Sequence, residues 1–148
     1  MTDSLYDKGV ANRRAVMGES HVSRSTAART EFSQPLNDLA MRYCWGELWS
    51  REGVSWKIRS LVCLALLATQ DKRVEFKAHV GGALRNGATM EEIQEVLLQV
   101  VIYCGLPTGS QAFRLAKEYL AEAEAAGDIP TPSQAQPAGQ QNDKKGDT

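Results

Sequence analysis

Glu75 and His79 are the first residues whose types and spacing could perform acid–base chemistry. They lie four residues apart, just ahead of a glycine-rich run at residues 81–87. On a helix, an i, i+4 pair shares one face, so the carboxylate could hydrogen-bond to the imidazole or face the same cavity. Imidazole titrates near neutral pH, which suits proton transfer. The spacing alone also fits an ordinary surface contact, so the pair is a candidate site.

Three arginines and a second histidine form another candidate group near the N-terminus. Arg13 and Arg14 are adjacent, and His21 and Arg24 follow within a polar stretch that we predict to be a loop. A guanidinium pairs with a carboxylate through two parallel hydrogen bonds, so this group is suited to binding an anionic substrate. The same residues could equally form a basic edge in contact with water.

The composition limits the classes of protein to which the chain can belong. Its 148 residues carry a formal net charge of −1, which gives no basic excess for binding nucleic acid or an anionic membrane. The longest apolar run, residues 61–68, is too short to cross a bilayer, and residues 1–20 lack the apolar core of a signal peptide. We therefore expect a cytoplasmic protein with no membrane or nucleic-acid partner.

The cysteines form no recognisable redox or metal motif. They are odd in number and widely spaced, which fits neither a set of disulfides nor a four-ligand zinc site: Cys44, Cys63 and Cys104. Each lies among apolar residues, where a free cysteine usually packs as a small hydrophobic side chain. With two histidines in the chain and no His-Glu-x-x-His pattern, we expect no metal site.

The apolar pattern of the N-terminal half predicts helices. A first helix is expected over residues 6–17 with Gly18 as its stop signal, and an interrupted helical segment over 26–47 leads into a tryptophan cluster. Tryptophans most often indicate packing or an oligomer interface, and a role for Trp45 as a pocket wall is the less favoured interpretation. After Ser55, a helix that is apolar all round is expected to be buried and central.

Three further helices carry recognisable local signals. Asp71 is expected to cap the helix that holds Glu75 and His79. Thr89 and Glu92 form a capping box for the next helix, and a last helix is expected from about residue 108.

No segment shows the alternation typical of strands, so the predicted fold class is all-α. We expect a compact bundle of about six to seven helices over residues 1–126. Its large apolar content predicts a homo-oligomer. Residues 127–148, rich in proline and glutamine, are expected to be a disordered tail.

Several motifs, in the same order along the chain, resemble the carboxymuconolactone decarboxylase family. The run from Glu75 to Pro107 resembles the core of that family, and it is preceded by matching N-terminal motifs: Tyr6-Asp-Lys-Gly9, Arg13-Arg-Ala-Val-Met-Gly18, His21-Val and Trp45-Gly-Glu-Leu-Trp49. The likeness covers residues 6–122. Related alkylhydroperoxidase-like proteins use a Cys-x-x-Cys, which is missing before His79, so thiol peroxidase chemistry of that type is disfavoured.

The resemblance implies an alkylhydroperoxidase-like fold and a homo-oligomer, with a hexamer as the expected size. It implies decarboxylation of γ-carboxymuconolactone to β-ketoadipate enol-lactone in protocatechuate catabolism, without a cofactor because the lactone ring accepts the electrons. In these terms His79 is the expected proton donor, Glu75 orients it, and His21 is the competing acid. The expected binders of the dicarboxylate lactone are Arg13, Arg14, Arg24 and Trp45.

Three alternatives to this function stay open. The same fold could decarboxylate or isomerise another lactone or keto acid. A thiol-dependent peroxidase could use one of the cysteines. A non-catalytic oligomeric binding module would need no convergence of these side chains on one pocket.

Overall fold

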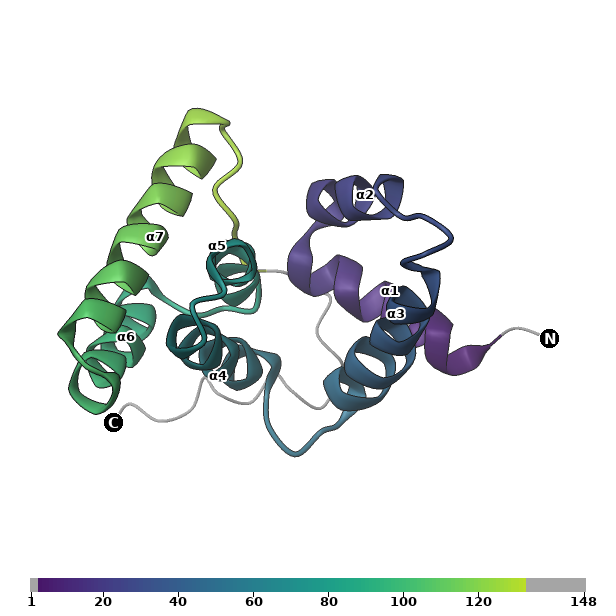
Figure 1. Cartoon of the computed structure of the whole chain (residues 1–148), viewed down its shortest axis with the longest axis horizontal. Helices are drawn as coiled ribbons and strands as arrows, with labels where there is room; N and C mark the ends of the chain where they lie inside the picture. The colour runs from purple at the N-terminus through teal and green to yellow at the C-terminus, as the bar shows by residue number, and fades with distance from the viewer. Residues whose placement is uncertain (1–2, 133–148) are drawn as a thin grey trace. The chain divides into compact units, whose positions relative to one another are not determined.

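The computed structural model describes residues 3–132, and every regular element in that range is helical. The predicted all-α fold class is thus confirmed. The chain divides into two units: unit 1 includes the residues up to Trp56, and unit 2 begins at Lys57 (Figure 1). Within residues 3–132, none of the helices has both the length and the apolar character needed to cross a membrane.

The predicted boundary at residue 126 and the predicted tail beyond it stay predictions. Most of that tail, residues 133–148, lies outside the described residues.

Unit 1 is built from helices of different lengths: α1 (Ser4–Met17), α2 (Glu19–Ala27), α3 (Gln34–Leu39), the π-helix η1 (Ala40–Glu47) and the 3₁₀-helix η2 (Leu48–Ser50). The Asp3 carboxylate begins α1 by accepting a hydrogen bond from the backbone N–H of Tyr6 at 3.2 Å. Gly18 ends the helix with a φ of 83°, a conformation that glycine adopts without steric cost. The predicted first helix and its stop signal are confirmed.

The predicted loop after Gly18 is wrong, because residues 19–27 form the helix α2. Its composition is polar, yet Val22 is buried and Glu19 lies in the first turn, where a negative charge is favoured by the helix dipole. Burial of one apolar side chain therefore selects the helix where local preference indicated a turn.

Two glycines let the backbones of α1 and η1 come into contact. A Cβ atom added at Gly9 would overlap the carbonyl oxygen of Met41, and one added at Gly46 would overlap the carbonyl oxygen of Leu5. Only a residue without a side chain fits at either position, because the obstructing atoms are backbone. This contact fixes α1 against η1 inside unit 1.

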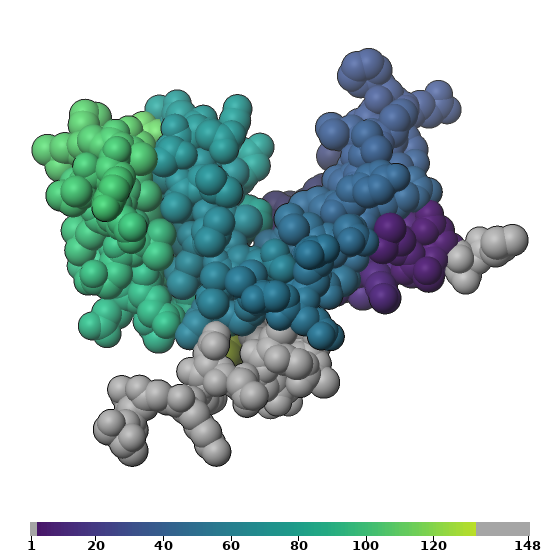
Figure 2. All heavy atoms as spheres, turned by 90° about the horizontal axis from the view of Figure 1, so that it is seen from below, coloured from purple at the N-terminus to yellow at the C-terminus, as the bar shows by residue number. Residues whose placement is uncertain are grey.

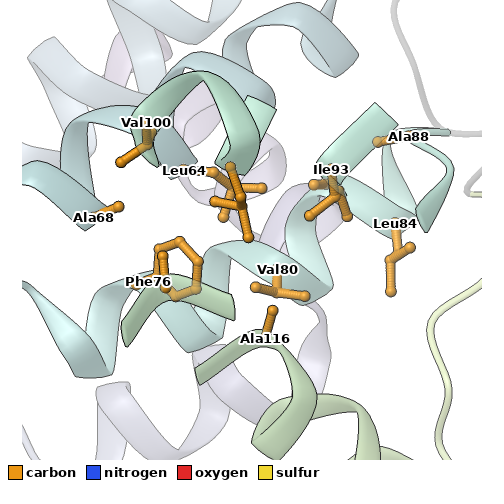
Figure 3. Close-up of a cluster of buried hydrophobic side chains, with 12 residues drawn as sticks. Leu64, Ala68, Phe76, Val80, Leu84, Ala88, Ile93, Val100 and Ala116 are labelled. Carbon is orange, nitrogen blue, oxygen red and sulfur yellow. The ribbon is translucent and has the colours of Figure 1, made fainter. Parts of the chain in front are cut away.

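Unit 2 contains four helices: α4 (Trp56–Thr69), whose first residue belongs to unit 1, α5 (Arg73–Arg85), α6 (Met90–Cys104) and α7 (Leu106–Ala125). Their atoms, coloured teal to green, form a continuous packed surface in the space-filling view (Figure 2). α7 packs against both α5 and α6. The close-up of the core shows Val80 of α5 between Leu64 of α4 and Ala116 of α7, with Phe76 beside them (Figure 3).

The local signals at the helix ends of unit 2 have mixed outcomes. The capping box is confirmed, since Thr89 accepts from the Glu92 N–H at 3.0 Å and Glu92 accepts from the Thr89 N–H at 2.9 Å. Asp71 does not cap α5, whose N-cap is Lys72. Instead Asp71 adopts a left-handed φ of 54°, and its carboxylate accepts hydrogen bonds from Arg73 at 2.9 Å and from Gln111.

The prediction that the apolar helix after Ser55 is buried all round is wrong for the single chain. Leu64 is buried, but Ile58 is 40% exposed, Val62 51% and Leu66 52%. These exposed side chains of α4, together with Val96 and Tyr103 of α6 and their neighbours, line an open apolar groove of about 370 Å³. One face of α4 therefore supplies the core while the other stays at the surface.

Candidate active site

Helix α5 positions Glu75 and His79 through the residues between and after them. Phe76 and Val80 are fully buried and anchor one face of α5 in the core of unit 2. Because α5 is continuous from Arg73 to Arg85, the two candidate residues lie one turn apart on the adjoining face. Glu75 lies in the first turn and is exposed, whereas His79 is half-buried. Their catalytic roles stay predictions.

In unit 1, helices α1 and α2 carry the other predicted residues in different environments. Arg14 is exposed, and its Nε lies 2.7 Å from a carboxylate oxygen of Glu19. Arg24 is exposed in the last turn of α2, and His21 is half-buried near its start. Arg14 is thus occupied by a carboxylate of the protein itself, while Arg24 points to solvent.

Arg13 lies in a more enclosed environment than Arg14, although the two are adjacent in sequence. It is half-buried, and its Nη2 donates to the Ser25 hydroxyl at 2.8 Å. Burial and the positive charge of Arg29 both lower the pKa of the Arg13 guanidinium. Arg29 is therefore close enough for the two cations to repel each other.

Arg29 is a residue that sequence reasoning missed. It is half-buried just beyond α2, and its Nη1 donates to the Tyr6 hydroxyl at 3.5 Å, across 23 positions of sequence. The only signal in the sequence is a further arginine shortly after Arg24, because the approach to Tyr6 and Arg13 depends on how α1 and α2 pack.

Trp45 lies within a packed group of aromatic rings. It is buried, and its ring stacks on that of Trp49 with centroids 5.0 Å apart and planes inclined by 24°. The Trp56 ring meets Trp49 edge to face at 6.2 Å, and its Nε1 donates to the Trp49 carbonyl at 2.7 Å. These contacts give Trp45 a packing role. Its predicted place in a substrate pocket is not tested by them.

Cys44, Cys63 and Cys104 all lie within residues 3–132, and none of them takes part in a disulfide. The Cys44 side chain reaches the surface, but neighbouring atoms crowd its thiol, and this burial raises the pKa of Cys44. A hydrogen bond with the Trp49 side chain and the Arg13 charge act in the opposite direction and do not reverse the shift. A raised pKa makes Cys44 a poor thiolate nucleophile at neutral pH.

Comparisons with known proteins agree on one family. A model of the carboxymuconolactone decarboxylase family matches residues 34–118. The 4-carboxymuconolactone decarboxylase of Acinetobacter baylyi is 36% identical over 116 residues, which cover 78% of this chain and 87% of that protein. The nitrosuccinic acid decarboxylase of Metarhizium robertsii is 36% identical over 108 residues, covering 73% of this chain and 76% of the relative. The chain therefore belongs to the carboxymuconolactone decarboxylase family.

Proposed function

We propose that this protein is a carboxy-lyase that converts γ-carboxymuconolactone to β-ketoadipate enol-lactone, as a cytoplasmic step of protocatechuate catabolism. The observation that carries the proposal is the 36% identity to the Acinetobacter 4-carboxymuconolactone decarboxylase, which extends over 87% of that protein. A match of this length includes both units of the chain. It therefore supports a shared reaction as well as a shared fold.

The reaction can be balanced from the substrate alone. The carbon γ to the lactone carbonyl loses its carboxylate as CO₂, and the bonding pair moves through the ring double bond into the carbonyl oxygen. One proton then adds at the carbon α to the carbonyl, which restores the lactone carbonyl and leaves the double bond in its new position. The protein must bind two carboxylates, stabilise the oxyanion and supply one proton.

We assign these tasks to the predicted residues as follows. His79 donates the proton or stabilises the oxyanion, and Glu75 holds its tautomer, with His21 as the competing acid. Arg13 is the stronger candidate for carboxylate binding, because its described hydrogen bond goes to a neutral hydroxyl, whereas Arg14 already pairs with Glu19. Arg24 and Trp45 remain secondary candidates for contacts with the lactone.

The test follows CO₂ release from freshly prepared γ-carboxymuconolactone. The wild-type protein should turn the lactone over, and His79→Ala should lower kcat at least about a hundredfold, as expected for the loss of a general acid. His21→Ala serves as the matched variant and should keep kcat within a few-fold of wild type. If His21→Ala loses the activity while His79→Ala keeps it, the proton belongs to His21. If the folded wild-type protein releases no CO₂ from the lactone, the proposed function is refuted.

A second candidate substrate is nitrosuccinic acid, because the Metarhizium nitrosuccinic acid decarboxylase is as similar in identity as the Acinetobacter protein. Both acids carry at least two carboxylates and an electron-withdrawing group, a nitro group in one and a conjugated lactone carbonyl in the other. The residues proposed here would serve either reaction. Measuring kcat/KM for both acids with one preparation decides between them, and we expect the lactone to be preferred.

We further propose that the chain forms a homo-oligomer, with a hexamer as the expected size. The support is the apolar groove of unit 2, where Val62 is 51% exposed and Tyr103 81%. Large exposed apolar patches of this kind usually mark interaction sites. Val62→Asp should lower the mass measured by light scattering, whereas Val74→Asp, at an exposed valine outside this groove, should not. Equal masses for both variants would contradict the proposed role of the groove.

A further inference from the structure

Arg13 and Arg29 share a feature that distinguishes them from the other arginines of unit 1. Both are half-buried, and the hydrogen bonds that the structure describes for them go to neutral hydroxyl groups: Arg13 to Ser25 at 2.8 Å and Arg29 to Tyr6 at 3.5 Å. The Nε of Arg29 is buried without a hydrogen-bond partner among the described residues. Two half-buried guanidinium groups thus make few hydrogen bonds within the described residues, and the charge of Arg29 acts on Arg13.

The carboxylates of unit 1 that form ion pairs are taken by other cations. Glu19 pairs with Arg14 at 2.7 Å and Asp3 with Arg42 at 2.6 Å. Within residues 3–132, neither Arg13 nor Arg29 makes an ion pair with an acidic side chain. Among the described residues, the two guanidinium groups are therefore without an ion-paired carboxylate, and the group that acts on Arg13 with opposite sign is the Cys44 thiol, whose own raised pKa keeps it mostly neutral near pH 7.

Such an arrangement is unfavourable unless an anion completes it. Like charges repel more strongly where water is partly excluded, and a buried donor without a partner costs free energy. The repulsion is visible in Arg13, whose pKa is lowered by burial and by the charge of Arg29. An anion that accepts hydrogen bonds from both guanidinium groups would relieve both costs at once.

We infer that Arg13 and Arg29 together bind one carboxylate group of the substrate. This inference rests on the proposed decarboxylase function, and it adds Arg29 to the site in place of Arg14. A carboxylate fits better than a single-atom anion, because it has two oxygens and can give one to the planar guanidinium of each arginine. Neither residue takes part in proton transfer; the pair holds the substrate.

The first experiment measures binding and turnover in Arg29→Gln, with Lys8→Gln as the matched control. Lys8 is exposed on α1, so its replacement removes one positive charge from unit 1 without touching the pair. Losing one charge-assisted contact should raise the KM for γ-carboxymuconolactone about 10- to 100-fold, while kcat changes little. The Kd for succinate, a stable dicarboxylate probe followed by tryptophan fluorescence, should rise similarly. Arg29→Lys should fall between wild type and Arg29→Gln, since it keeps the charge and loses the fork.

A second readout separates a binding role from a structural one. Without ligand and at low salt, Arg29→Gln should be at least as stable as wild type, because the repulsion between the two cations is gone. Succinate should raise the Tm of the wild type and of Lys8→Gln but not that of Arg29→Gln. A lower Tm of ligand-free Arg29→Gln with an unchanged KM would show that Arg29 is structural and would overturn the inference.

The outcomes also distinguish this inference from the proposed reaction. If the wild-type protein turns over the lactone and Arg29→Gln has the same KM and the same Kd for succinate, the carboxylate site is refuted and the proposed reaction stands. If the protein does not turn over the lactone but binds succinate in a way that depends on Arg29, the proposed reaction is refuted and the carboxylate site stands. Inorganic phosphate that binds as tightly as succinate, with the same dependence on Arg29, would contradict the assignment to a carboxylate.

Discussion

Replacing Gly9 with alanine tests the contact between α1 and η1 on which the geometry of unit 1 depends. The added Cβ would overlap the Met41 carbonyl oxygen and lie 2.8 Å from the Met41 carbonyl carbon and 3.0 Å from the Gly46 nitrogen. These are backbone atoms, which cannot rotate away, so the cost should reach the upper end of overpacking, about 3 kcal/mol. Alanine recovers about 1 kcal/mol of helix propensity. The net loss of stability should therefore be about 2 kcal/mol.

Thermal unfolding followed by circular dichroism measures this loss. A change of about 2 kcal/mol corresponds to a fall in Tm of roughly 6–8 °C for a chain of this length. Gly53→Ala is the control, because a Cβ at Gly53 meets no atom within 4 Å, and its Tm should stay near that of wild type. If Gly9→Ala is as stable as Gly53→Ala, the two helices do not touch as described. The KM for the lactone should also rise in Gly9→Ala, since Arg13 lies one turn further along α1.

Two smaller effects follow from single groups. Thr89→Ala should lower the free energy of unfolding by about 1 kcal/mol in urea titrations, whereas Thr89→Ser, which keeps the capping hydroxyl, should retain most of it. Because burial raises the pKa of Cys44, the folded thiol should react with iodoacetamide more slowly at pH 8 than in urea. The stabilisation linked to this shift is complete below the unfolded pKa of about 8.5 and is lost as the pH rises through the folded pKa. Equal rates of iodoacetamide labelling of Cys44 in the folded protein and in urea would contradict the raised pKa.

The features that could be predicted from the sequence are those that neighbouring residues determine. The capping box of α6 needs only Thr89 and Glu92, three positions apart, and both reciprocal hydrogen bonds are present. The end of α1 at Gly18 follows likewise from one residue that tolerates a positive φ. At Asp71 the same local reasoning was wrong, because contacts with Arg73 and the distant Gln111 hold its carboxylate away from the end of α5.

The features that could not be predicted depend on contacts between distant segments. Helix α2 contains a single buried residue, Val22, so its apolar pattern is too weak to outweigh the turn-forming preference of its serines. Arg29 approaches Tyr6 across 23 positions, and no spacing rule connects the two. Arg13 and Arg14 look equivalent in sequence, but successive helix positions point about 100° apart, which places one beside Ser25 and the other beside Glu19.

The π-helical hydrogen bonding of η1 also allows for a change of length. An i→i+5 hydrogen bond spans one residue more than the i→i+4 bond of an α-helix, so η1 is equivalent to an α-helix that has gained a residue by insertion. Deleting the exposed Tyr43 would allow α-helical bonding, with Met41 and Gly46 still about one turn apart on the same face. Because Met41 faces Gly9 while Gly46 faces Leu5, both contacts with α1 could survive the deletion. The crossing of α1 and η1 therefore depends on the two glycines more than on the number of residues between positions 41 and 46.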